Sequence, residues 1–299
     1  MKSTSKAAEQ DLAQLAIEAH GGLERWKHFT TLSVHGINGG VLWGAKGKAG
    51  VLDDVTVTVD LRDEKASHWP FGSPDRRSRF EPQRVVLENT NGKVLGELLQ
   101  PRSSFQGHIL ETPWSDLQLA YFAGCAMWTY LNIPFLLVRP GVESEEVEPW
   151  QEAGETWRRL RVRFPKDIAT HSAEQTLYFD QQGLLKRHDY DVEISGGTPA
   201  AHYLSDLKEF SGIVFSHEEE NLGPPTGRPF RARTVGRLDR PRSFCPHIGY
   251  DQPVSARAKG PQQTRRNSVC ATHGFSSGSH CSRTGKGKSR KEARGASLH

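Results

Sequence analysis

Short runs of alternating apolar and polar residues, joined by tight-turn signals, constrain the fold of this chain most strongly. Residues 55–61 alternate between Val or Leu and Thr or Asp, and residues 157–164 set apolar side chains against three arginines after one irregular step. The pair Asn91-Gly92 and the segment 180–183 (Asp-Gln-Gln-Gly) each separate two apolar runs, as hairpin turns do. This pattern predicts a mainly β (α+β) fold: a large antiparallel sheet with one covered face. We expect roughly eight to eleven strands in a curled sheet, because a wide twisted sheet rarely stays flat.

Two segments have helical periodicity instead. The first predicted helix spans about residues 9–20, with an apolar stripe that begins at Leu12, and it ends at Gly21-Gly22. The second begins at Thr112-Pro113, which has the form of an N-cap followed by proline, and it ends before Pro134.

The second predicted helix is apolar nearly all round, because no charged residue occurs between Asp116 and Arg139. The stretch has almost the length of a membrane span. Its Gln118, Gly124 and Asn132 favour a different interpretation, a helix packed within the concave side of the sheet.

The charge distribution changes near Phe215. Residues 222–299 contain 16 of the 39 Lys and Arg but only 3 of the 35 Asp and Glu. We therefore expect a disordered N-terminus (1–8), a half-barrel β domain (9–215) and a basic, disordered tail (216–299). Two other interpretations of the tail stay open. It could be an arm that contacts nucleic acid phosphates non-specifically. It could also be frameshifted sequence, since codons for residues 216–221 and 234–239 permit a more strand-like continuation when shifted by one base.

Three segments of the body together have a recognisable pattern. They are the opening at residues 20–26 (His-Gly-Gly-Leu-Glu-Arg-Trp), the hairpin at 178–185, and the late strand pair at 203–206 and 210–215. Over about residues 8–215 this pattern resembles the half-barrel fold of LolA-type lipoprotein carriers and their LppX-like relatives. It is more similar still to an uncharacterised bacterial group that shares the Gly-Gly-Leu-Glu-Arg-Trp opening. The resemblance implies an open, curved antiparallel sheet around a hydrophobic cavity plugged by helices, and binding of an acyl chain or another apolar ligand.

Aromatic residues in and beside the second predicted helix are the candidate ligand site. Apolar binding sites are concave and rich in aromatic side chains, although the same residues could simply fill a core. The five candidates are Trp114, Tyr121, Phe122, Trp128 and Phe135. The expected function is therefore non-catalytic binding of a hydrophobic or lipid-like ligand.

Two other function classes stay open. A hydrolase could use His171, His188 or His202 with a carboxylate in a cleft. On the strand that contains His188, Tyr190 would share its face, whereas Asp189 would point to the other. An interaction module, or a degraded gene product, would instead have its cavity filled by aromatic side chains.

No motif in the chain has the spacing of a phosphate-binding loop, a zinc site or a nucleophile elbow. We therefore expect no cofactor, no metal and no catalytic residue. The body contains one cysteine, Cys125, and the N-terminus lacks the apolar core of a secretory signal. These features favour a cytoplasmic location. A lipid or another apolar small molecule is the expected partner, without a transmembrane span.

Overall fold

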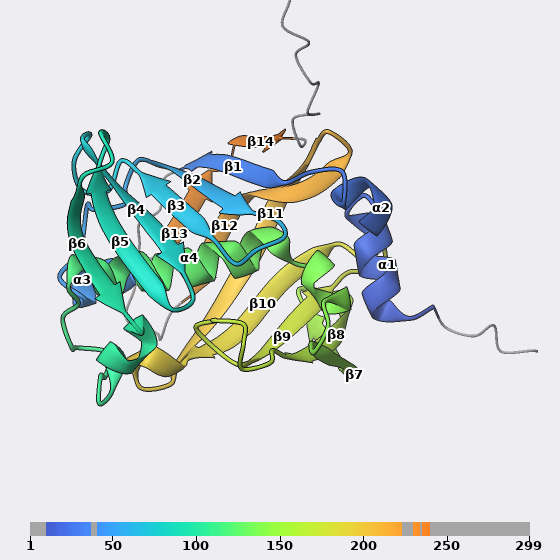
Figure 1. The fold of residues 1–299 in the computed structure, drawn as a ribbon. Coiled ribbons are helices and arrows are strands. Elements are labelled where there is room, and N and C mark those ends of the chain that lie inside the picture. Colours follow the sequence, from blue (N-terminus) through green and yellow to red (C-terminus); the bar gives the residue numbers. More distant parts are fainter. Residues whose placement is uncertain (1–9, 37–40, 223–229, 234, 240–299) are drawn as a thin grey trace, which may run out of the picture. The chain divides into compact units, whose positions relative to one another are not determined.

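Two antiparallel sheets and one long helix make up most of the structure (Figure 1). The computed structural model describes residues 10–36, 41–222, 230–233 and 235–239. Each sheet has seven strands, every neighbouring pair is antiparallel, and neither strand order closes on itself. The expected open, mainly β architecture is therefore confirmed, with the difference that the strands divide into two sheets.

Sheet A carries the alternation that defines the fold. Its strand order is β14-β1-β2-β3-β4-β5-β6. The bounds are β1 (Thr31–Gly36), β2 (Val55–Asp60), β3 (Ala66–Trp69), β4 (Arg76–Glu81), β5 (Arg84–Asn89), β6 (Val94–Leu99) and β14 (Val235–Asp239). In β2 every second side chain is buried, and Val57 and Val59 lie opposite Val34 and Leu32 of β1. One face of the sheet is thus apolar and covered.

Sheet B has the order β13-β12-β11-β10-β9-β8-β7. The bounds are β7 (Glu143–Glu152), β8 (Glu155–Arg163), β9 (Glu174–Phe179), β10 (Leu185–Val192), β11 (Thr198–Phe210), β12 (Ile213–Leu222) and β13 (Phe230–Arg233). The described residues thus contain more strands than the eight to eleven expected. Strand β7 illustrates the reason: it is an edge strand exposed along almost its whole length, so it has no apolar alternation to reveal it.

The strands continue beyond Phe215, where the charge change suggested the end of the β domain. Strand β12 extends to Leu222, β13 pairs with β12, and β14 pairs with β1. Backbone pairing needs no particular side-chain charge, which is why the charge boundary and the last strand do not coincide. The expected disordered N-terminus (1–8) and residues 240–299 of the expected tail lie outside the described residues.

Short helices flank the sheets. They are α1 (Leu12–Ala19), α2 (Leu23–Trp26), α3 (Val41–Ala45) and the 3-10 turns η1 (Pro101–Phe105), η2 (Phe135–Val138) and η3 (Glu193–Ser195). Helix α1 begins after Asp11, whose side chain accepts a hydrogen bond from the Gln14 backbone. Gly21 and Gly22 follow with φ of 112° and 85°, so the predicted glycine stop is confirmed.

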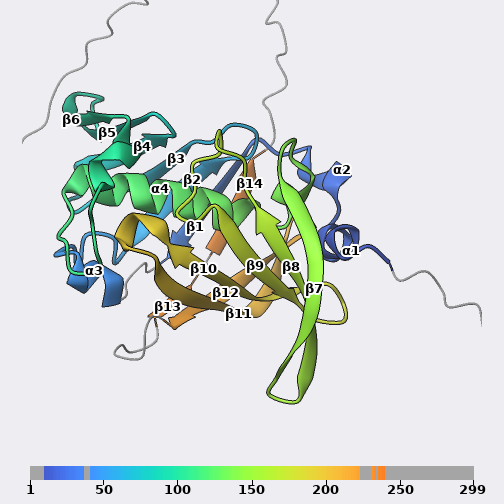
Figure 2. The ribbon, with the colours of Figure 1, turned by 90° about the horizontal axis from the view of Figure 1, so that it is seen from below.

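Helix α4 (Asp116–Asn132) lies between the two sheets (Figures 1 and 2). Its N-cap is Ser115, so the predicted start at Thr112 is wrong. Ser115 and Gln118 form a capping box, in which each side chain bonds the other's backbone N–H. Thr112 instead accepts a hydrogen bond from the Ile109 backbone and closes the preceding turn.

Most of α4 is buried, and it approaches sheet A closely. Gly124 faces Phe80 of β4, and a Cβ atom at that position would lie 2.3 Å from the Phe80 ring. The helix therefore occupies the concave side of the sheets, as its uniform hydrophobicity predicts. Among the helices that the structure describes, none combines the length and hydrophobicity of a membrane span.

Candidate ligand site between the sheets

An aromatic layer runs along the N-terminal half of α4. Tyr121 lies between Phe80 of β4 and Phe105 of η1, with ring centroids 5.7 Å from each. Trp114 packs against Phe122 at 5.0 Å and against Phe105 at 5.4 Å. All five rings are buried, so three of the candidate ligand residues belong to one continuous layer whose contacts are those of a packed core.

The other two candidates hold the fold together at the far end of α4. The Trp128 indole N–H donates to the backbone oxygens of Asp60 and Asp63, at 2.8 and 3.0 Å. Phe135 stacks on Trp26 at 4.2 Å with an interplanar angle of 8°. Trp128 therefore anchors the β2–β3 turn, and Phe135 anchors the Leu-Glu-Arg-Trp segment of the chain's opening. Whether either contacts a ligand stays a prediction.

A pocket of about 450 Å³ opens between the two sheets, and Tyr121 lines it. Its walls come from the β4–β5 turn, from η1, and from the loop at residues 164–173 that joins β8 to β9. Phe164 and Ile168 in this lining are buried, whereas Lys166 and Asp167 are exposed. Because Tyr121 is fully buried, it marks the inner end of the pocket.

One arginine fixes the loop that walls the pocket. The Arg102 guanidinium of η1 donates to the Thr170 backbone oxygen at 2.6 Å and pairs with the Glu193 carboxylate at 2.5 Å. Glu193 also accepts a hydrogen bond from the Ala173 backbone at 2.6 Å. These contacts tie η1, the loop and η3 together around the pocket.

Two buried polar groups lie near the pocket. Burial and Cys125 raise the pKa of the Tyr121 hydroxyl, whereas its interaction with the Arg102 guanidinium lowers it. Glu64 Oε1 is buried without a hydrogen-bond partner; the other oxygen of this carboxyl accepts the Ala169 backbone N–H at 3.0 Å, and Ala169 lines the pocket. Burial raises the pKa of Glu64 to about 8, which outweighs the lowering effect of the Ala169 hydrogen bond. The Glu64 carboxyl is therefore protonated near neutral pH.

A second, largely buried group joins three histidines and two tyrosines on the side of α4 that faces sheet B. Tyr130 of α4 has ring contacts at 4.9–5.9 Å with all four other members: His171, His188, Tyr190 and His202. We call these five residues the His–Tyr cluster. The predicted shared face of His188 and Tyr190 is confirmed by their 5.0 Å ring distance. Asp189, on the opposite face, bonds Tyr178 and Arg187.

Hydrogen bonds within the His–Tyr cluster join neutral groups. The Tyr130 hydroxyl donates to Tyr190 at 2.6 Å, and His188 Nε2 lies 2.6 Å from the Gln175 amide oxygen. Burial lowers the pKa of His171 to about 3, assisted by His202 and Arg102, and burial also lowers the pKa of His188 well below its usual value. In the described structure no carboxylate bonds the imidazole of His171 or His188.

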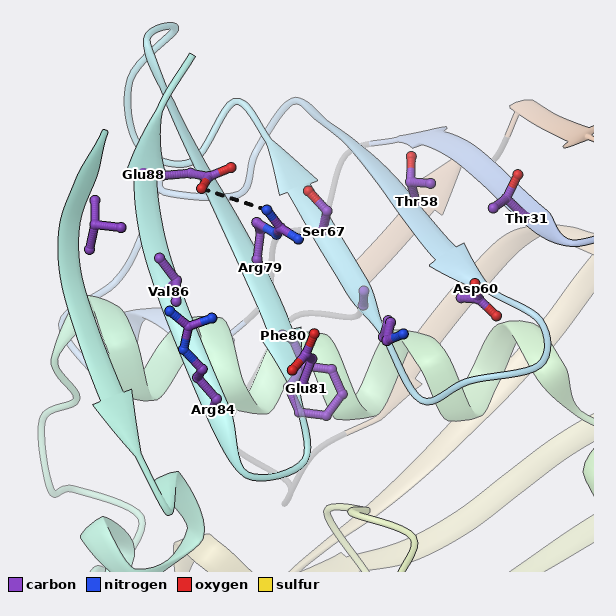
Figure 3. A pocket seen from close by; sticks show the side chains of 13 residues that line it. Thr31, Thr58, Asp60, Ser67, Arg79, Phe80, Glu81, Arg84, Val86 and Glu88 are labelled. Carbon is purple, nitrogen blue, oxygen red and sulfur yellow. Dashed lines mark ion pairs between the residues drawn. The ribbon is translucent and has the colours of Figure 1, made fainter. Parts of the chain in front are cut away.

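A hollow of about 390 Å³ lies on the face of sheet A that points away from α4 (Figure 3). Its charged side chains largely pair with neighbours. Glu88 bonds Arg77 at 2.5 Å and lies 3.9 Å from Arg79, while Arg84 pairs with Glu97. No residue that lines the hollow has a buried polar side-chain atom without a hydrogen-bond partner. No grouping of His, Cys, Asp or Glu in the described part of the chain suits a metal ion.

The residues that shape the pocket were not identified from the sequence, apart from Tyr121. Arg102 and Glu193 lie in 3-10 segments, which have no periodicity to reveal which way a side chain points. Arg102 contacts residues far along the chain. Pro101-Arg102 directly follows a strand, and a proline at that position indicates a turn but no binding role.

Comparison with known proteins finds similarity to solved structures only. No family model matches the sequence, and no curated protein matches it. Among solved structures, a LolA superfamily protein from Nitrosomonas europaea matches at 10% identity and a TM-score of 0.46, over 77% of this chain and 94% of that one. A putative outer membrane lipoprotein-sorting protein domain from Vibrio parahaemolyticus matches at 12% identity and 0.33, over 79% and 95%.

The Mycobacterium tuberculosis lipoprotein LppX matches at 12% identity and a TM-score of 0.26, over 78% of this chain and 98% of that one. These proteins are of the class that the sequence pattern resembles. Because each TM-score is below 0.5, the fold described above rests on the sheets and helix of this chain themselves.

Proposed function

We propose that this protein binds a hydrophobic or lipid-like ligand in the pocket between its two sheets, without catalysing a reaction. The observation that supports the proposal is the position of Tyr121. This candidate ligand residue lies at the inner end of a pocket of about 450 Å³, which is within the size range of small-molecule sites.

The walls of the pocket suit an amphipathic molecule. Phe164, Ile168 and Tyr121 supply apolar surface, and burial of an alkyl chain there is worth about 0.8 kcal/mol per CH₂ group. The exposed Lys166 and Asp167 surround the solvent side. A ligand with an apolar body fits this arrangement better than a highly charged one, which would lose its hydration inside.

Ala173→Trp tests the location of the ligand. Ala173 lines the pocket yet is exposed, so a larger side chain there occupies the pocket without displacing the core. Its structural hydrogen bonds use the backbone and survive the substitution. We expect the affinity for the apolar fluorophore diphenylhexatriene to fall at least tenfold, about 1.4 kcal/mol. Native mass spectrometry of the purified protein would show any ligand that co-purifies.

Ala49→Trp is the matched control, because Ala49 is also exposed but lies outside the pocket lining. It should leave binding unchanged. Equal loss of affinity in both variants, or no loss in Ala173→Trp, would place the fluorophore elsewhere. Thermal unfolding of both variants verifies that each one folds.

The hydrolase alternative required a carboxylate within hydrogen-bonding reach of the cleft histidines. His171 and His188 instead contact Tyr130 and Gln175. The structure therefore gives no observation that favours hydrolysis over binding, and we do not develop it further.

A further inference from the structure

We propose that the His–Tyr cluster is a pH-sensitive switch: at neutral pH it holds the loop at residues 164–173 on α4, and its protonation frees this loop and releases the ligand. This inference rests on the proposed function, because the loop is a wall of the pocket between the two sheets. We expect the affinity for an uncharged apolar ligand to fall between about pH 7.5 and about pH 5, while the protein remains folded.

His171 is the member of the cluster that lies on this pocket-wall loop. Its neighbour Thr170 lines the pocket, and so does Ala173. The His171 side chain is fully buried, and its ring contacts two rings of α4, those of Phe122 at 6.0 Å and Tyr130 at 5.3 Å between centroids. The loop is therefore packed on α4 through an imidazole that must stay neutral, because an isolated charge is costly in such a site.

His188 connects the cluster to the same loop through hydrogen bonds. Its Nε2 lies 2.6 Å from the Gln175 amide oxygen, so this nitrogen carries the proton and donates it. The Gln175 amide nitrogen in turn donates to the Thr170 hydroxyl and to the Ser172 backbone oxygen, both at 2.8 Å. One chain of hydrogen bonds thus runs from β10 through β9 to a residue that lines the pocket.

The groups that face His171 and His188 carry no negative charge in the part of the chain that the structure describes. On sheet B, His188 lies opposite an apolar residue of β9 and opposite His202 of β11. Asp189 points to the other face of the sheet, where it bonds Tyr178 and Arg187. The titratable groups that α4 and β10 add are the hydroxyls of two tyrosines, which bond each other. Protonated imidazoles would therefore gain no carboxylate partner from these elements.

The charges that act on the two imidazoles are positive. Arg102 of η1 affects His171 electrostatically, after the larger effects of burial and His202. The Glu193 carboxylate beside Arg102 is already paired with that guanidinium. The ring centroids of His171 and His188 are 6.5 Å apart, so a second proton would enter beside the first. Movement of the loop away from α4 would relieve this repulsion and return the imidazoles to water.

The difference in proton affinity between the closed and open states sets the direction of the switch. Burial lowers the pKa of His171 to about 3 and that of His188 well below its usual value, whereas an imidazole in water has a pKa of about 6.5. The open state therefore binds more protons, so the closed state is fully favoured above about pH 6.5 and loses this advantage as the pH falls. Between about pH 7.5 and about pH 5, each imidazole favours opening by up to roughly thirtyfold.

The experiment measures the affinity for diphenylhexatriene, which has no charge of its own, across this pH range, with far-UV circular dichroism to verify folding. We expect the folded wild type to bind at least about tenfold more weakly at about pH 5 than at about pH 7.5. His171→Gln removes one imidazole and keeps a neutral polar side chain. It should bind the probe at about pH 7.5, and its loss of affinity on acidification should be at least about threefold smaller. His188→Gln serves in its place if His171→Gln does not fold.

His68→Gln is the matched control. His68 is as buried as His171, and burial lowers its pKa to about 4, but it lies on β3, bonds Ser78 and is outside the pocket lining. This variant should alter overall stability and keep the wild-type pH dependence of binding. Equal flattening in the His68 and His171 variants, or loss of affinity only where the folded spectrum is lost, would show global unfolding and overturn the inference.

Two outcomes separate this inference from the proposed function. If diphenylhexatriene binds the wild type with the same affinity at about pH 7.5 and about pH 5, the inference is wrong and the proposed function survives. If diphenylhexatriene does not bind the wild type at about pH 7.5, the proposed function fails and the inference fails with it.

Discussion

Acidification from about pH 6 to about pH 4.5 should destabilise the folded protein, because several of its histidines are buried where they cannot easily accept a proton. Burial lowers the pKa of His68 to about 4 and of His171 to about 3, and it lowers that of His188 well below the usual value. In the unfolded chain each imidazole has a pKa of about 6.5. A lowered folded-state pKa means that the unfolded state binds more protons. The stabilising contribution is thus complete above the unfolded pKa and is lost as the pH falls below it.

Glu64 acts in the opposite direction over the same range. Its folded pKa is raised to about 8 from 4.5, so the folded state holds one proton that the unfolded chain has released. In the unfolded state the three imidazoles take up three protons and the Glu64 carboxyl forgoes one, a net uptake of about two, or roughly 2.7 kcal/mol per pH unit. His20, whose pKa burial also lowers, acts in the same direction. Over about 1.5 pH units the loss is roughly 4 kcal/mol, a large part of the roughly 5–15 kcal/mol that stabilises a typical domain.

Urea unfolding followed by tryptophan fluorescence at several pH values measures this slope. Glu64→Gln removes the opposing proton, so its slope should steepen to about three protons, or roughly 4 kcal/mol per pH unit. Carboxylates with a lowered pKa, such as Asp116, begin to lose their contribution only near their unfolded value of 3.8, below most of this window. A free energy of unfolding that is flat between about pH 6 and about pH 4.5, or an identical slope in both proteins, would refute the reasoning.

Two further substitutions test the packing and capping of α4. Gly124→Ala should destabilise the protein by about 2–4 kcal/mol in urea unfolding, because the added Cβ would lie 2.3 Å from the Phe80 ring. Gly44→Ala is its control: nothing lies within 4 Å of a Cβ there, so a loss of the same size would contradict the packing argument. Ser115→Ala should cost about 1 kcal/mol, because the Gln118 backbone N–H loses its acceptor. An unchanged midpoint would show that the capping box contributes nothing.

The sequence predicted those elements that are stabilised by residues close together in the chain. The alternation of β2 and the glycine turn after Asp180 reappear in the structure because they depend on neighbouring residues alone. The start of α4 was misplaced, since Thr112 and Ser115 both have cap-forming side chains and only the capping box with Gln118 decides between them. Strand β7 was missed because solvent covers most of it.

The candidate site, too, could be predicted only in part from the sequence. His188 and Tyr190 could be placed on one face from their spacing in β10, whereas their meeting with Tyr130 of α4 depends on how the helix docks. The fixed position of Arg102 beside Thr170, which is 68 residues away along the chain, has no sequence signal at all. Tyr121 was identified as an aromatic residue on an apolar helix, and its position in the pocket lining could be found only in the structure.

Several unpartnered polar atoms in the described interior lie around Phe122 of α4. The indole N–H groups of Trp43 and Trp114 and the Nδ1 atom of His171 all lack partners, and all three rings contact Phe122. A core selected for stability alone would replace such groups with apolar ones of similar size, since each costs about 1–3 kcal/mol when buried without a partner. None of these three residues lines the pocket beside Tyr121, so a ligand in that pocket would not supply the missing partners. The polar atoms around Phe122 are therefore a cost that the packing of the described interior bears.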